Sequence, residues 1–167
     1  PIVIGTTGLQ EQHMSLLEEA SYMAPILYAP NMSLGITLLL SLVEKVASTL
    51  DNNFDIEILE KHHKLKKDAP SGTALALGKA AAKGRQNPKD TFITNWSNHP
   101  LRQEGEIGFA VQRGGTIPGE HVVSFFGPDE TIELRHHANS RRIFAEGALQ
   151  AASWLYDKKP GLYDMKD

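Results

Sequence analysis

The chain has 167 residues, a formal net charge of -3 and no cysteine. Its length is enough for a buried core in one domain or one and a half, and the absence of cysteine excludes disulfide bonds and thiolate chemistry and fits a reducing compartment. The most apolar stretch, residues 34–43, is too short to span a bilayer, so we expect a cytoplasmic protein with no membrane partner and no nucleic-acid partner.

The first part of the sequence predicts strands that alternate with helices. The apolar pattern indicates a strand at 2–4, a helix at 10–21, a strand at 25–30 and a helix at 34–50. The last of these is apolar almost all round, so we expect it to be buried on more than one side. The turn Gly5-Thr6-Thr7-Gly8 follows the first strand, at the end where ligands bind in open α/β sheets, although its residues alone favour an ordinary strand-to-helix connection. Because Pro1 begins directly in a strand, we expect the chain to be the later part of a longer protein.

The rest of the sequence predicts a β-rich region followed by a helix. The expected elements are a strand at 54–59, a helix at 71–83, a loop at 85–103 with a short strand at 91–94, strands at 106–112, 121–127 and 131–136, a helix at 141–156 and an irregular tail at 162–165. We expect the three strands after residue 105 to form an antiparallel block. The glycine-rich loop 113–120 is either a mobile connection or a functional segment. Because Asp and Glu are absent at ligand spacing, we interpret His121, His136 and His137 as structural or interface residues rather than metal ligands.

One segment concentrates charge and titratable groups. Residues 60–73 read EKHHKLKKDAPSGT, with two adjacent histidines and four lysines in a chain of negative net charge. Such a patch attracts anions, and the Pro-Ser-Gly-Thr sequence predicts a capped helix start whose backbone N–H groups form a second anion receptor. A small ligand with two carboxylates could bind to the basic patch and to the helix start together. The histidines would then be free to transfer protons near neutral pH. On composition alone, a solvated lysine face with an incidental His-His pair is the simpler interpretation.

The order of residues in this segment resembles the signature of dihydrodipicolinate reductases, E-x-H-H-x-x-K-x-D-A-P-S-G-T-A, at every fixed position. The resemblance covers the later part of the family's length. It implies an α/β part, the remnant of a Rossmann-like nucleotide-binding domain at residues 1–33 and 141–167, and an α+β part at residues 34–140, a mixed-sheet domain for substrate binding and tetramerisation. The implied activity is the reduction of a cyclic dicarboxylate imine with NADH or NADPH by a homotetramer in lysine and diaminopimelate synthesis.

The same resemblance implies roles for particular residues. His62 would donate a proton in catalysis, and Lys66 would be the second catalytic residue, because a lysine can bind a carboxylate and stabilise developing negative charge. His63, Gly72 and Thr73 would contact substrate carboxylates, the last two through the helix N-terminus. The residues implied to contact the nicotinamide half of the cofactor lie in two loops: Gly5, Thr6, Thr7, Ala29, Pro30, Asn31 and Met32.

Two other interpretations stay open on the sequence alone. The chain lacks a G-x-G-x-x-G turn, so it could be a catalytically inactive fragment of such an enzyme that binds dicarboxylates and forms tetramers. The adjacent histidines could instead belong to a metal-dependent hydrolase, which we favour less, and we expect no metal site.

Overall fold

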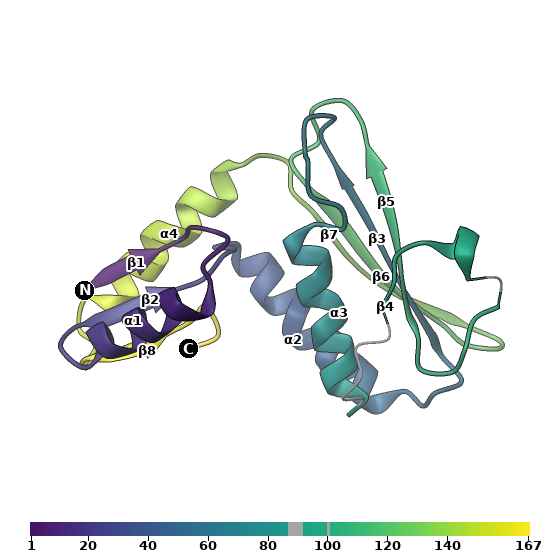
Figure 1. Cartoon of the computed structure of the whole chain (residues 1–167), viewed down its shortest axis with the longest axis horizontal. Coiled ribbons are helices and arrows are strands. Elements are labelled where there is room, and N and C mark those ends of the chain that lie inside the picture. The colour runs from purple at the N-terminus through teal and green to yellow at the C-terminus, as the bar shows by residue number, and fades with distance from the viewer. Residues whose placement is uncertain (87–91, 100) are drawn as a thin grey trace. The chain divides into compact units, whose positions relative to one another are not determined.

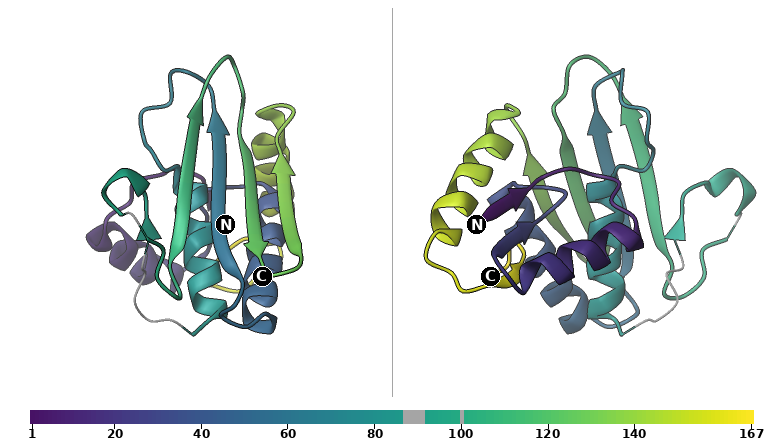
Figure 2. Two further views of the ribbon diagram at one scale, coloured as in Figure 1. Left: turned by 90° about the vertical axis from the view of Figure 1, so that its right-hand side faces the viewer. Right: turned by 60° about the vertical axis from the view of Figure 1, so that its left-hand side comes forward.

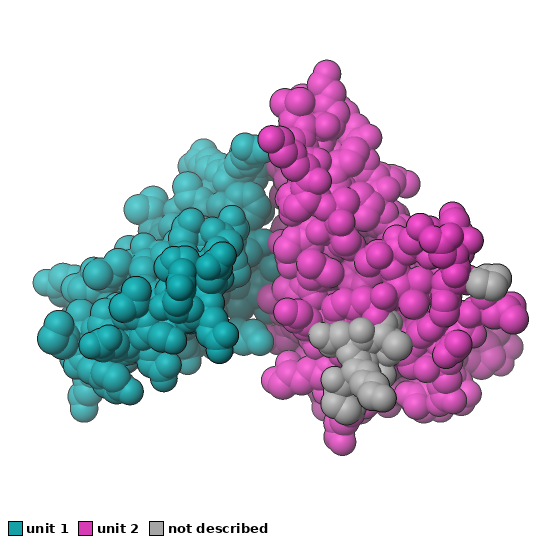
Figure 3. Space-filling model, in the orientation of Figure 1, with its two compact units in different colours: residues 1–37, 140–167 teal, residues 38–139 magenta. Residues whose placement is uncertain are grey.

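The chain forms two compact units, each built around a sheet of its own (Figure 1). The computed structural model describes residues 1–86, 92–99 and 101–167, so the start of the strand expected at 91–94 lies outside the described residues. The first unit comprises residues 1–37 and 140–167, and the second comprises residues 38–139 (Figure 3). Within the described residues, no helix combines the length and the apolar character that crossing a membrane requires. The expected fold class, an α/β part and a part with a mixed sheet, is confirmed.

A three-stranded parallel sheet organises the first unit. In sheet order its strands are β1 (Ile2–Ile4), β2 (Pro25–Tyr28) and β8 (Gly161–Tyr163), and its helices are α1 (Glu11–Ser21) and α4 (Arg142–Leu155). The predicted tail is therefore wrong at residues 162 and 163, where Leu162 pairs with Ile26 of β2. Three residues are too few to show an alternating pattern, and the pairing is a contact with a distant part of the chain.

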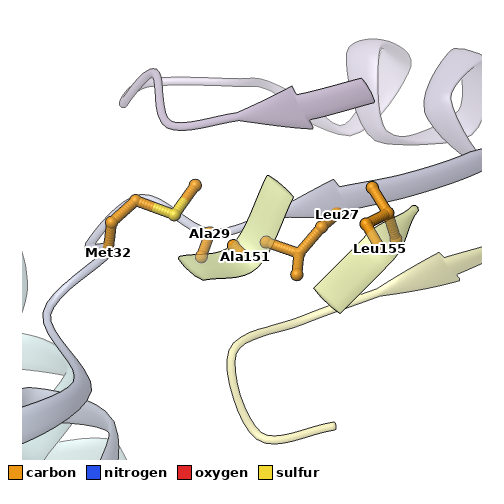
Figure 4. Close-up of a cluster of buried hydrophobic side chains, with 5 residues drawn as sticks. All are labelled: Leu27, Ala29, Met32, Ala151 and Leu155. Atoms are coloured by element: carbon orange, nitrogen blue, oxygen red, sulfur yellow. The ribbon is translucent and has the colours of Figure 1, made fainter. Parts of the chain in front are cut away.

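The core of the first unit joins β2 to α4. Its buried side chains, drawn in Figure 4, are Leu27, Ala29, Met32, Ala151 and Leu155. The helix approaches the segment after β2 so closely that a Cβ atom at Gly147 would overlap the backbone carbonyl of Met32. Glycine is thus required at this position by the absence of space.

A five-stranded mixed sheet organises the second unit. Its order is β4 (Phe92–Ile93), β5 (Ile107–Arg113), β3 (Asp55–His62), β6 (Glu120–Phe126) and β7 (Thr131–His137). The central strand β3 runs parallel to β5 and antiparallel to β6. The expected antiparallel block is correct for β6 and β7 and wrong for β5, because β3 lies between β5 and β6. Apolar alternation identifies a strand but does not identify its neighbour.

Two helices lie on one face of this sheet, as Figure 2 shows. They are α2 (Leu34–Thr49), whose first residues belong to the first unit, and α3 (Gly72–Gly84); a short 3₁₀ helix spans Trp96–Asn98. α3 contacts β3 and β5, and Lys83 of α3 forms an ion pair with Glu44 of α2 at 2.8 Å. The expectation that α2 is buried on more than one side is wrong, because Leu34, Leu38 and Leu42 form an exposed stripe at a spacing of four residues.

Candidate active site

One face of the central strand β3 carries apolar side chains in its first half and polar side chains in its second half. Alternation places Ile56, Ile58, Glu60 and His62 on the same face, and all four side chains are buried. Nδ1 of His62 lies 2.5 Å from Oε2 of Glu60, whose side chain has no exposed surface. Because the carboxylate engages Nδ1, the other ring nitrogen, Nε2, is left to face a ligand.

The Glu60 carboxylate is held by three further hydrogen bonds. Arg113 of β5 donates to both oxygens, at 2.8 Å to Oε2 and 2.7 Å to Oε1, and the backbone N–H of Ser71 donates to Oε1 at 2.9 Å. Burial alone would raise the pKa of Glu60, but the hydrogen bonds from His62, Arg113 and Ser71 together lower this pKa to about 2. Glu60 is therefore ionised at neutral pH, and its hydrogen bonds raise the pKa of Arg113 above the ordinary value.

Ser71 connects this carboxylate to helix α3 and to a second histidine. Its Oγ caps α3 by accepting the backbone N–H of Ala74 at 3.1 Å and lies 3.1 Å from Nε2 of His121 on β6. Burial, and then the proximity of His62, lower the pKa of His121 to about 4, so this ring is neutral at pH 7. Its Nδ1 is buried and has no hydrogen-bond partner among the residues that the structure describes.

The glycine-rich loop between β5 and β6 belongs to the site. Gly114 donates its N–H to the carbonyl of His62 at 3.0 Å, and His63 donates its N–H to the carbonyl of Ile117 at 2.8 Å. The loop is thus tied to the segment that follows β3, at the same end of the sheet (Figure 1). A Cβ atom at Gly119 would lie 3.1 Å from Nε2 of His62, so the absence of a side chain there leaves this nitrogen uncovered on that side.

The predicted catalytic lysine lies beside the start of α3. Nζ of Lys66 donates to both carboxylate oxygens of Asp68, at 2.7 and 2.8 Å. The hydrogen bond from Lys66 is the main cause that lowers the pKa of Asp68, and the backbone N–H of Gly72 also contributes. Lys66 and the first residue of α3 therefore converge on one carboxylate, which is the arrangement that the sequence predicts for a bound anion.

The other predicted substrate contacts flank this position, and the basic run divides between two faces. His63 follows β3 directly, and Thr73 lies in the first turn of α3. Lys61 belongs to the opposite face of the sheet from His62, where its Nζ lies 3.6 Å from Glu120. Charge alone therefore overstates how many lysines serve the site.

The residues expected to contact the cofactor lie in the first unit, in two loops that follow neighbouring parallel strands. Ala29 donates its N–H to the carbonyl of Ile4 at 3.1 Å, which keeps the two strand ends together. The side chains of Thr6, Thr7 and Pro30 are exposed, Gly5 is exposed and Asn31 is half-buried. In contrast, Ala29 and Met32 are buried in the core of the unit, so they could reach a ligand only through their backbone.

Several site residues have no role in the sequence-based prediction. Glu60 is part of the signature, but the sequence-based prediction gives it no role. Because Glu60 precedes His62 by two residues on one strand, the pattern already predicts that their side chains lie on the same face of the sheet. Arg113 and His121 carry no local signal, because they reach the site through sheet pairing. His121 is buried, which agrees with a structural position, one of the two roles that the sequence leaves open for it.

The fold and the site define an α/β protein with a Rossmann-like parallel sheet and a separate mixed-sheet unit that carries a histidine–carboxylate site. Among known families, the dihydrodipicolinate reductase C-terminus matches residues 35–167, and the dihydrodipicolinate reductase N-terminus matches residues 1–32. The chain belongs to the dihydrodipicolinate reductase family.

Individual relatives agree with this assignment. The chain is 51% identical to a 4-hydroxy-tetrahydrodipicolinate reductase of Zymomonas mobilis, covering 100% of this chain and 66% of the relative, and 53% identical to one of Methylocella silvestris, covering 99% and 61%. Its structure is similar to that of dipicolinate-bound dihydrodipicolinate reductase from Paenisporosarcina sp. TG-14, with a TM-score of 0.73, 25% identity, and coverage of 97% of this chain and 62% of that one. The chain thus spans less than two thirds of the length of these relatives.

Proposed function

We propose that the protein carrying this chain reduces 4-hydroxy-tetrahydrodipicolinate, which becomes dihydrodipicolinate by loss of water, to tetrahydrodipicolinate with NADH or NADPH, in lysine and diaminopimelate biosynthesis. The observation that carries the proposal is the pairing of His62 with a buried carboxylate beside Lys66 and the N-terminus of α3. Both relatives named above bear the name of this reductase, and the similar structure is described as bound to dipicolinate, a dicarboxylate.

His62 has the features of a proton donor. An imidazole can hold and release a proton near neutral pH, and the bond from Nδ1 to Glu60 fixes the orientation of the ring. Nε2 then donates its proton to ring carbon C3 of the substrate.

The substrate carboxylates bind to cationic and backbone donors around the start of α3. Lys66, His63 and the backbone N–H groups of Gly72 and Thr73 supply these donors. The present partner of Lys66, Asp68, is an exposed carboxylate, so exchange for a substrate carboxylate replaces one such ion pair by another. Lys66 also stabilises negative charge as it develops in the transition state.

The two loops of the first unit suit a nicotinamide cofactor. They follow adjacent parallel strands at the carboxyl end of the sheet, the usual place for such ligands, and the turn Gly5-Thr6-Thr7 presents exposed side chains and backbone there. Residues 29–32 form the second of these loops and would contact the cofactor as well. The cofactor, when bound, supplies the hydride that is delivered to ring carbon C4.

The remaining parts of the proposal concern organisation. Residues 1–33 and 141–167 are assigned to the nucleotide-binding domain and residues 34–140 to substrate binding and association. We further propose a cytoplasmic homotetramer that associates through the sheets of the second unit. This assembly would cover apolar residues on the sheet face opposite the helices, among them the partly exposed Phe126.

The test is steady-state kinetics of the whole protein with NADH and with NADPH, together with inhibition by dipicolinate. His62→Gln should lower kcat with a modest change of KM, because a group that acts in the transition state is removed. Lys66→Ala should raise KM and lower kcat. Lys64→Ala, which removes an exposed lysine of the same run, is the matched control and should change little. Unchanged turnover of the His62 variant would refute its role, and a wild-type protein without nicotinamide-dependent reduction would refute the function.

A further inference from the structure

The two oxygens of Glu60 serve two different parts of the site. Oε2 lies 2.5 Å from Nδ1 of His62, and Oε1 accepts the backbone N–H of Ser71, the N-cap of α3. One buried carboxylate therefore fixes both the ring that donates the proton and the helix end that receives the substrate carboxylates. The contact with Ser71 joins residues eleven positions apart along the chain.

Arg113 makes this arrangement stable in a buried position. Its guanidinium binds both oxygens of Glu60 and also donates to the backbone carbonyl of Asp68 at 2.7 Å. An unpaired carboxylate without solvent contact would be strongly unfavourable, whereas a bidentate Arg pair with additional donors compensates the lost hydration. The same arginine thus connects β5, Glu60 and the loop that leads to α3.

We propose that Glu60, supported by Arg113, is a positioning residue that sets both the tautomer and orientation of His62 and the location of the α3 N-terminus. This inference rests on the proposed function. An ionised Glu60 has no proton to donate, so the hydrogen bond requires the proton on Nδ1 of His62. When the imidazolium gives up its Nε2 proton, the electron pair of that N–H bond returns to Nε2, and Nδ1–H stays bonded to Glu60. The carboxylate itself is not protonated.

The pH dependence of this step depends on the charges around His62. Glu60 of β3 and Arg113 of β5 are in the same hydrogen-bonded group, and the neutral His121 of β6 lies edge-on with ring centroids 5.2 Å apart. Lys66 and Asp68 lie in the segment before α3, and His136 faces His121 from β7. Among these, Glu60 is the negative charge in direct contact with the ring, so its removal disfavours the imidazolium.

The first test is the pH profile of kcat for the whole protein and for Glu60→Gln. We expect a loss of roughly 10- to 100-fold in kcat, the range found for residues that orient a metal-bound histidine, with a severalfold rise of KM because one amide oxygen cannot accept from both His62 and the N–H of Ser71. The descending limb of the profile should move to lower pH, since a neutral amide no longer stabilises the protonated acid. A loss of stability alone would lower the amount of folded enzyme without moving this limb.

The matched control is Glu57→Gln. Glu57 lies on the same strand three residues earlier, on the opposite face, and is paired with Arg102 as Glu60 is paired with Arg113. This variant should keep the wild-type pH profile. A Glu60 variant with the wild-type kcat and limb, or a control with the same shift, would overturn the inference.

A second measurement does not depend on activity or on a folded Glu60 variant. Imidazole ¹⁵N NMR of the whole wild-type protein, with His62 assigned through His62→Gln, should show the neutral ring protonated on Nδ1. Protonation on Nε2 would overturn the inference even if the Glu60 variant does not fold. If the wild-type protein has no reductase activity, the proposed function fails, and the tautomer alone then decides whether Glu60 positions the ring.

Discussion

His121 should make the second unit lose stability between pH 8 and pH 5. Its pKa is lowered from 6.5 to about 4 in the folded protein, mainly by burial, so the unfolded chain takes up a proton in this range before the folded one does. A group of this kind stabilises the fold fully above pH 6.5, and this contribution is lost as the pH falls towards 4. At pH 5, the unfolded ring is about 97% protonated and the folded ring about 10%, which corresponds to a loss of roughly 2 kcal/mol.

The assay is urea unfolding of the whole protein at pH 8 and pH 5, followed by hydrogen exchange in peptides from β3 and β6. These peptides report on the second unit alone. His121→Gln retains an amide that can bond to Ser71 but cannot titrate, so the loss between the two pH values should shrink by roughly 2 kcal/mol. His137→Gln changes a half-exposed histidine on the neighbouring strand β7 and serves as the control. An equal loss in the His121 variant and in the wild type would show that the buried neutral ring is not the cause.

Two further predictions concern the cores of the units. Phe125→Ala removes a completely buried ring from the second unit and should cost about 3–5 kcal/mol in urea unfolding, whereas Phe126→Ala, at a neighbouring ring that is 43% exposed, should cost clearly less; equal costs would contradict the described sheet faces. Gly147→Ala should destabilise the first unit by on the order of 1–3 kcal/mol, because the new methyl group would overlap the carbonyl of Met32, and hydrogen exchange in peptides from α4 would detect it. Unchanged exchange there would mean that α4 does not approach the segment after β2 so closely.

The sequence predicts the elements well where a pattern is local. The alternation at 54–59 and the Ser71 cap identify β3 and α3, and the signature places His62 and Lys66 between them. The prediction includes Arg113 only as the first residue of the loop 113–120. It gives this residue no role of its own, because Arg113 follows Glu60 by 53 residues and meets it only through the parallel pairing of β3 and β5. That pairing depends on which strands become neighbours, and apolar periodicity does not contain this information.

The exposed stripe on α2 shows the opposite limitation. Leu34, Leu38 and Leu42 are as apolar as the buried residues between them, so composition could not tell the two sides apart. The first unit illustrates the same point for function. The resemblance implies a cofactor contact for both Met32 and Thr6, yet the side chain of Met32 is buried and that of Thr6 is exposed. Sequence indicates which loop is involved, and the packing determines which atoms it presents.

Because side chains alternate along β3, the packing of its isoleucines in the hydrophobic core also determines which residues reach the active site. Ile56 and Ile58 lock the strand between β5 and β6, and the same phase brings Glu60 and His62 to the inner face. A shift of the pairing register by one residue would place Lys61 or His63 where His62 lies. It would also turn both isoleucines to the opposite face of the sheet. Insertions and deletions should therefore be tolerated in the loop that precedes β3 but not within the strand, where the insertion or deletion of one residue would move His62 to the other face of the sheet.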